Sequence, residues 1–345
     1  MAQQAQHIVM PYFRIALISK YRTALMGIGI LDVLFWHMAT CYQLEGVSAQ
    51  IVGTLTRSVF TSGFLFLSGF GIYFSYSNNP NKKLFYRRRF ERLVIPFWVI
   101  VTIIFLLRLA ISGVGDLPFY LGTLTTACYW IPGKTFNYWF IAVIFLFYII
   151  YPHIHDFIFG KTERHSKQSV YIKVALICSI LVLLNILLGN YYPYYKEIEL
   201  AIPKLPMLFL GMLAGYLAKE RDAKINMYSY CFILCILIFL YTLKEGNLYF
   251  DQYYYIIDKL LTIPILVLIF DFLEKKVLFF RRILPLLCWL GVYTLEIYVI
   301  HIYLMRVVSD FPQLPQTAEW WIAVPIALLI CMPVQKLTKF ITKAR

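Results

Sequence analysis

Apolar runs of about 20 residues follow one another along almost the whole chain, and they constrain its fold more than any other feature. A helix needs about 20 apolar residues to cross the hydrocarbon core of a membrane. Ten such runs can be marked out, at 21–42, 50–75, 92–112, 136–155, 170–189, 200–218, 227–244, 254–273, 284–307 and 319–341. A membrane β-strand would instead alternate apolar and polar residues. The sequence therefore predicts an all-α, polytopic integral membrane protein, a helical bundle of about ten transmembrane helices.

The composition supports this class and excludes several others. Hydrophobic residues make up 61% of the 345 residues and charged residues only 14%, against roughly 45–50% and about 25% in soluble globular chains. Such a chain cannot hide its apolar surface in one soluble core, which excludes a soluble enzyme, a disordered protein and a coiled coil. Because no polar linker is long enough to separate domains, we expect residues 1–345 to form a single transmembrane domain.

The basic residues indicate an orientation. The chain carries 32 Lys and Arg against 18 Asp and Glu, a net charge of +14. If the chain crosses the membrane ten times, 24 of the 32 basic residues lie on one side of the membrane. The other 8 lie on the opposite side or in the parts of the spans near that side. Cytoplasmic loops are enriched in Lys and Arg, so both termini are expected in the cytoplasm. This distribution explains the charge without a nucleic-acid partner and predicts a multi-pass protein of the plasma or inner membrane.

A few titratable residues lie inside the predicted spans, where a charge costs about 2.5–3.5 kcal/mol on insertion scales and therefore suggests a site. The interior candidates are Asp32, His37, Arg57, Glu296 and His301. His37 follows Arg22 by 15 residues, which corresponds to roughly 22 Å along a helix and places it in the outer half of the membrane. Arg57 and His301 fall at a similar depth. We therefore predict one polar layer built from three helices.

These residues allow two interpretations each. A histidine can take and return a proton near neutral pH, so it suits a base for a hydroxyl acceptor, but either imidazole could equally be a hydrogen-bonded packing residue. Asp32 precedes His37 by one turn plus one residue, so the two lie on roughly the same helical face. It could orient that ring or form a salt bridge elsewhere. Glu296 could orient His301 or pair with Arg57.

Other catalytic patterns are missing from the sequence. It contains no GxSxG motif and no HExxH motif, and its seven cysteines include no CxxC pair. We therefore expect neither an acyl-enzyme through serine nor a bound metal, and we take the cysteines as small buried hydrophobic residues.

A basic segment at 82–92 joins the second and third predicted spans. It could be a topology anchor that binds anionic lipid, or it could bind phosphate, because guanidinium groups match phosphate oxygens. Arg89 and Arg92 are three residues apart at the expected start of a helix and should point the same way. They could hold a phosphorylated cytoplasmic ligand at the mouth of the bundle.

Several stretches, in order along residues 22–301, resemble the membrane-bound acyltransferase family 3. They are MGIGILDVLFWH at 26–37, FLFLSGFGIY at 64–73, FYRRRFERLVIPFW at 85–98, YWFI at 138–141 and LGVYTLEIYVIH at 290–301. The resemblance implies transfer of an acyl group, usually acetyl from acetyl-CoA, to a sugar hydroxyl of an extracytoplasmic or lipid-linked glycan.

The resemblance also implies roles for particular residues. The family's proposed catalytic histidine corresponds to His37, its Arg-x-x-Arg motif to Arg89 and Arg92, and its Ser-Gly-Phe motif to 68–70. The chain departs from the pattern at three positions. Many members carry Arg eleven residues before the histidine, where this chain has Met26, and Arg22 is the nearest arginine. The other two departures are Asn137 in place of histidine and Thr294 in place of serine.

We therefore expect a membrane O-acyltransferase. The CoA phosphates would bind at Arg88, Arg89 and Arg92, and the pantetheine arm would pass Ser68 and Gly69. His37 would act as general base, Asp32 or Glu296 would orient an imidazole, His301 would belong to the same site, and Arg57 would stabilise developing negative charge. The expected partners are a glycan or lipid-linked sugar acceptor and membrane lipid, and a homo-oligomer is left open.

Two other classes of function use the same residues. A transporter or flippase of glycan or lipid could use the intramembrane charges as a translocation path, although the paired repeats common in transporters are not visible. A structural subunit of a glycan-assembly complex would leave the polar layer unexplained.

Overall fold

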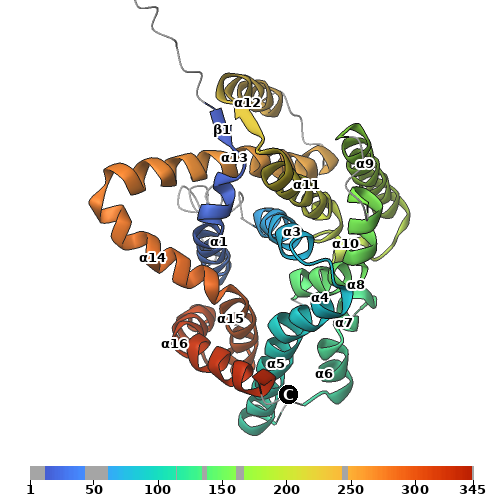
Figure 1. The fold of residues 1–345 in the computed structure, drawn as a ribbon. Coiled ribbons are helices and arrows are strands. Elements are labelled where there is room, and N and C mark those ends of the chain that lie inside the picture. The colour runs from blue at the N-terminus through green and yellow to red at the C-terminus, as the bar shows by residue number, and fades with distance from the viewer. Residues whose placement is uncertain are drawn as a thin grey trace, which may run out of the picture.

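The computed structural model describes residues 12–42, 61–113, 115–133, 138–160, 167–242 and 248–343, and this part is almost entirely helical (Figure 1). Its elements are β1 Tyr12–Arg14, α1 Leu17–Cys41, α3 Thr61–Ser77, α4 Lys82–Arg89, a π-helical turn Phe90–Val94, α5 Ile95–Ser112, α6 Leu117–Leu124, α7 Ala127–Trp130, α8 Trp139–Phe159, α9 Lys167–Tyr191, α10 Tyr195–Ile198, a 3-10 turn Ile202–Lys204, α11 Pro206–Arg221, β2 Lys224–Asn226, α12 Met227–Thr242, α13 Leu248–Lys276, α14 Leu278–Val292, α15 Thr294–Val308 and α16 Gln316–Lys343. The two strands pair antiparallel. The predicted all-α class is confirmed.

The helices have the membrane character that the apolar runs predict. Within the described ranges, four are long and apolar enough to cross a membrane: Lys82–Ser112, Trp139–Phe159, Lys167–Tyr191 and Gln316–Thr342. The pair α14 and α15 meets the same test if it counts as one bent span. The count of ten spans and the cytoplasmic position of both termini stay predictions.

The ninth predicted span, 284–307, is two helices instead of one. The helices α14 and α15 meet at an angle of 66°, on either side of Tyr293. The Thr294 hydroxyl donates to the carbonyl oxygens of Leu290 at 3.1 Å and Gly291 at 2.9 Å. A hydroxyl that bonds to the preceding turn competes with the regular helical ladder and favours a bend. The bend sets the direction of the segment that carries Glu296 and His301.

Two prolines of the sixth apolar run, Pro203 and Pro206, lie at the start of a helix instead of inside one. Pro206 is the first residue of α11, and Pro203 belongs to the 3-10 turn before it. A proline at the first helical position loses no hydrogen bond, because that amide has no partner within the helix. Pro264 does lie inside a helix, α13.

Direct backbone contact fixes α1 against α14. A Cβ atom on Gly27 would lie 1.9 Å from the Leu287 carbonyl oxygen, and one on Gly291 would lie 1.8 Å from the Thr23 carbonyl oxygen. Small residues let membrane helices approach closely, and their packing replaces the hydrophobic effect that is absent between helices in lipid. No larger residue fits this crossing without moving one of the helices.

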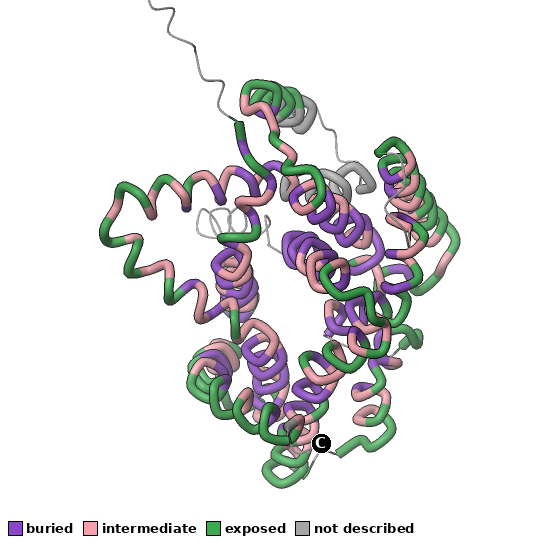
Figure 2. Tube along the Cα trace, viewed as in Figure 1, coloured by how far each residue is buried: buried purple, intermediate pink, exposed green. Residues whose placement is uncertain are grey.

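The burial of individual residues agrees with a bundle whose helices face a common interior. Figure 2 shows buried residues on the helix faces that look toward the middle of the bundle and exposed residues around its outside. The outer residues include large apolar side chains such as Leu106, Ile149 and Leu329, which are 56%, 64% and 75% exposed. An outer surface of this kind suits lipid as its solvent.

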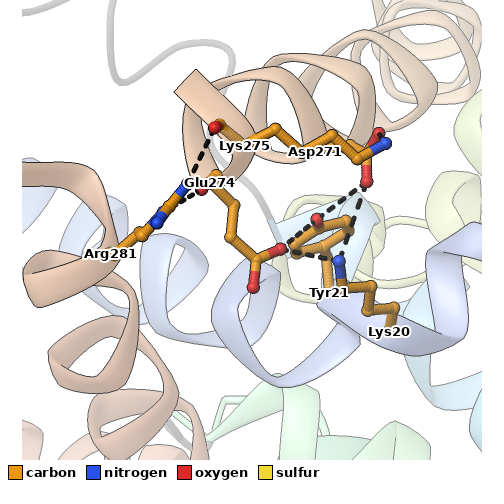
Figure 3. Close-up of polar contacts among 6 residues, drawn as sticks. All are labelled: Lys20, Tyr21, Asp271, Glu274, Lys275 and Arg281. Atoms are coloured by element: carbon orange, nitrogen blue, oxygen red, sulfur yellow. Dashed lines mark hydrogen bonds and ion pairs between the residues drawn. The ribbon is translucent and has the colours of Figure 1, made fainter. Parts of the chain in front are cut away.

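A charged cluster joins the start of α1 to the end of α13 (Figure 3). Lys20 Nζ lies 2.6 Å from Glu274 Oε2, to which the Tyr21 hydroxyl also donates. The hydrogen bond from Lys20 lowers the pKa of the Glu274 carboxyl. Arg281 donates to the carbonyl oxygens of Glu274 and Lys275. These are last-turn carbonyls of α13 that have no partner within the helix. The cluster fixes the end of α1 from which Arg22 projects.

We expect Gly27→Ala to destabilise the protein, because the new methyl group would overlap the α14 backbone. Overpacking of this kind costs about 1–3 kcal/mol, and the melting temperature in detergent measures it. The control is Gly115→Ala, whose methyl group would meet only the flexible end of Leu109. Equal melting temperatures for both variants would contradict the packing described here.

Candidate functional site

Two histidines from distant parts of the sequence meet inside the bundle. The rings of His37 on α1 and His301 on α15 lie 5.2 Å apart, centroid to centroid, at an interplanar angle of 61°. His301 is fully buried, and His37 is partly exposed. The structure therefore brings together two of the residues predicted to share one depth. The third, Arg57, lies outside the described residues.

The hydrogen bonding of His301 fixes its protonation pattern. Its Nδ1 lies 2.7 Å from the Ile297 carbonyl oxygen, which can only accept, so Nδ1 carries the hydrogen. In a neutral imidazole the other nitrogen then has a free lone pair. This atom, Nε2, is buried and has no hydrogen-bond partner among the described residues. His301 thus presents a hydrogen-bond acceptor beside His37.

The two carboxylates near the histidines have different surroundings. Glu296 is 4% exposed and accepts a hydrogen bond from Gln335 Nε2 at 3.3 Å, which links α15 to α16. The sequence did not indicate this partner. Asp32 is partly buried on α1, about one turn before His37. The roles predicted for Asp32 and Glu296 in orienting an imidazole stay predictions.

Arg22 lies at the other end of α1 and contacts α3. Its Nε donates to the Leu67 carbonyl oxygen at 2.9 Å. Its guanidinium covers Gly71, where a Cβ atom would lie 2.5 Å from the Arg22 Cζ. Arg89 and Arg92 lie close enough to interact electrostatically with it. Arginines from two distant segments therefore lie near one another. Arg22 is placed to add its positive charge to the phosphate site predicted at the basic segment.

The basic segment forms α4 and the π-helical turn after it. Arg89 is partly buried, and its guanidinium lies 5.3 Å from the Phe85 ring and 5.2 Å from the Tyr148 ring. Arg92 is exposed, so the two side chains differ in burial. Both nevertheless interact electrostatically with Arg22. That Arg89 and Arg92 point the same way stays a prediction.

The basic side chains differ in whether they are neutralised. Arg87 pairs with Glu91 at 2.8 Å. In the described part of the chain Arg88 and Arg92 have no ion pair, and Arg89 Nε is buried without a hydrogen-bond partner. Positive charges that lie close together without carboxylates beside them repel one another, so the arrangement is unfavourable unless an anion binds between them. This arrangement suits an anionic ligand that carries more than one charge.

Ser68 and Gly69 lie beside Leu67, the residue that Arg22 contacts. A Cβ atom on Gly69 would lie 2.0 Å from the Leu208 carbonyl oxygen of α11. This crossing of α3 and α11 explains the glycine without a ligand. Ser68 is partly buried. The predicted path of a ligand past these residues stays a prediction.

Sequence reasoning missed an aromatic cluster next to Arg89. Phe85 stacks on Tyr151 at 5.3 Å, and Tyr151 contacts the His155 ring at 5.9 Å. Among the described residues, the Tyr151 hydroxyl and both ring nitrogens of His155 are buried without hydrogen-bond partners, although His155 Nδ1 lies 3.8 Å from Asp156 Oδ1. The aromatic residues lie in an apolar run rich in such residues, so only His155, a titratable residue within the predicted span 136–155, could have indicated the cluster.

We expect the neutral His301 ring to carry its hydrogen on Nδ1, because the Ile297 carbonyl oxygen accepts from that nitrogen. Nitrogen-15 NMR of the histidine-labelled protein near neutral pH distinguishes the two tautomers. The Nδ1–H signal should disappear in His301→Gln and persist in His153→Gln, which removes an exposed histidine of α8. A signal of the Nε2–H tautomer at His301 would contradict this assignment.

Comparison with known proteins agrees with the motifs in the sequence. A family model described as an acyltransferase domain matches residues 23–335, nearly the whole chain. Neither the search of curated proteins nor the search of solved structures finds a match. The matched range includes the histidine pair, the Arg89 and Arg92 pair and the helix break. The chain therefore belongs to the membrane-bound acyltransferase family 3.

Proposed function

We propose that the protein is a membrane O-acyltransferase that moves an acetyl or other small acyl group from cytoplasmic acyl-CoA to a hydroxyl of a cell-surface or lipid-linked glycan. Family membership supports acyl transfer. The observation that carries the proposal is the layout of α1. Arg22 at one end joins Arg89 and Arg92, and His37, roughly 22 Å further along, meets His301.

The donor is expected at the basic end. Acyl-CoA carries several phosphate charges, and guanidinium groups bind phosphate oxygens with paired, charge-assisted hydrogen bonds. Arg88, Arg89 and Arg92 have donors free for such bonds. Arg22 adds a fourth positive charge nearby. The thioester at the far end of the pantetheine arm would then point along α1 toward His37.

The histidine pair supplies the proton chemistry. His37 takes the proton of the acceptor hydroxyl as the oxygen attacks the thioester carbon. The carbon–sulfur bond breaks, and the imidazolium returns the proton to the leaving thiolate, which yields an acyl ester and free CoA. The lone pair on His301 Nε2 provides a second acceptor for this proton. Arg57 would stabilise the negative charge on the thioester oxygen.

The site is expected at the plasma or inner membrane, with the donor inside and the acceptor outside. A transporter or flippase that uses the same charges would move its substrate without consuming acyl-CoA. A purified protein in lipid vesicles distinguishes the two, because only the transferase releases free CoA when both substrates are present.

We expect His37→Ala to abolish acylation, since it removes the base. Mass spectrometry of cell-surface glycans, with and without the gene, measures the transferred acyl mass and identifies the acceptor. Loss of a general base lowers the rate about 10²–10⁴-fold. His153→Ala, at an exposed histidine of the same membrane domain, should leave acylation unchanged. Full acylation by His37→Ala at normal expression would exclude the proposed base.

We expect Arg22→Gln and Arg89→Gln to raise KM for acyl-CoA about 10- to 100-fold, because each removes a charge-assisted hydrogen bond worth about 1.5–3 kcal/mol. The KM for acyl-pantetheine, which lacks the phosphates, should change little. Arg87→Gln is the matched control, because Glu91 already neutralises Arg87. If KM rose equally for acyl-CoA and acyl-pantetheine, these arginines would not bind the CoA phosphates.

A further inference from the structure

One partly buried lysine, Lys204, forms no salt bridge among the described residues. Lys204 ends the 3-10 turn before α11, and its Nζ lies 4.7 Å from the centre of the Trp139 ring. The side chain is partly buried, and Trp139 is 9% exposed. Among the described residues no hydrogen bond or ion pair reaches this ammonium. Glu199 is the carboxylate whose charge acts on it.

Ring contacts link the residues on either side of Trp139 to the helix that carries His301. Tyr138, the neighbour of Trp139, stacks on Tyr303 with ring centroids 5.2 Å apart and an interplanar angle of 22°. Tyr303 follows His301 by two residues, or about 3 Å along α15. A second series of ring contacts leads from Phe140 through Tyr298 to His301, at 6.1 Å and 6.0 Å. The start of α8 therefore connects Lys204 to the proposed reaction site.

The chemistry of this pair favours an anion. A partly desolvated ammonium that forms no salt bridge is unfavourable, and an indole face compensates only part of the loss. A carboxylate or phosphate in contact with the ammonium would supply the missing ion pair.

We propose that Lys204 and Trp139 form an acceptor subsite that binds an anionic group of the glycan and so selects acidic acceptors. The inference rests on the proposed O-acyltransferase function, since it names the class of acceptor. The anionic group is a carboxylate of an acidic sugar or the phosphate of a lipid carrier. Lys204 is here a residue of acceptor binding and takes no part in proton transfer.

The test measures binding and turnover with chosen probes. The probes are tri-galacturonate, its neutral methyl ester and a polyprenyl-phosphate-linked N-acetylglucosamine, each with the purified full-length protein in detergent. The variants are Lys204→Gln, Lys204→Arg and the control Lys196→Gln, which alters an exposed lysine of α10. Calorimetry gives Kd, and CoA release from acetyl-CoA gives kcat and KM for the probes that are acylated.

We expect Lys204→Gln to weaken binding of one anionic probe tenfold or more, while binding of the methyl ester is unchanged. Lys204→Arg should restore the affinity, and Lys196→Gln should have no effect. A loss confined to tri-galacturonate identifies the carboxylate, and a loss confined to the lipid-linked probe identifies the phosphate. The proposal is overturned if the wild-type protein shows no preference for either anionic probe over the methyl ester, or if Lys204→Gln weakens all three probes equally. Absence of CoA release with any acceptor would instead refute the transferase, and the calorimetry would still decide the subsite.

Discussion

The contact between the backbones of α1 and α14 is the constraint on which the candidate site depends. Gly27 and Gly291 bring the two helices together without side chains between them. Directly after this crossing, the chain bends by 66° into α15. Because α1 carries Arg22 and His37, while α15 carries His301, the crossing and the bend together position the histidine pair relative to the basic end.

Much of this arrangement was predictable from the order and depth of residues. The distance from Arg22 to His37 follows from helical rise alone, and each of the ten apolar runs overlaps one or two of the longer helices. The common depth of His37 and His301 followed from the same counting. Helical rise and hydropathy are local properties, so they can be predicted from the sequence without knowledge of the tertiary contacts.

Other features depend on tertiary contacts and could not be predicted. The break at Tyr293 arises where Thr294 bonds back to the preceding turn, and hydropathy continues across it. The π-helical turn Phe90–Val94 interrupts the α-helix within the basic segment, and the spacing of the arginines does not indicate it. The position of Arg22 beside Arg89 depends on how α1 and α4 lie relative to each other, and no local sequence pattern predicts this placement.

The contact of Arg22 with Gly71 has a consequence for how the family can vary. The guanidinium fills the space that a side chain at position 71 would need. A side chain at position 71 would therefore displace the Arg22 guanidinium from its place beside Leu67, whereas a shorter residue at position 22 would leave room for alanine or serine at 71. Homologous sequences should show these two positions changing as a pair, although they lie 49 residues apart in the chain.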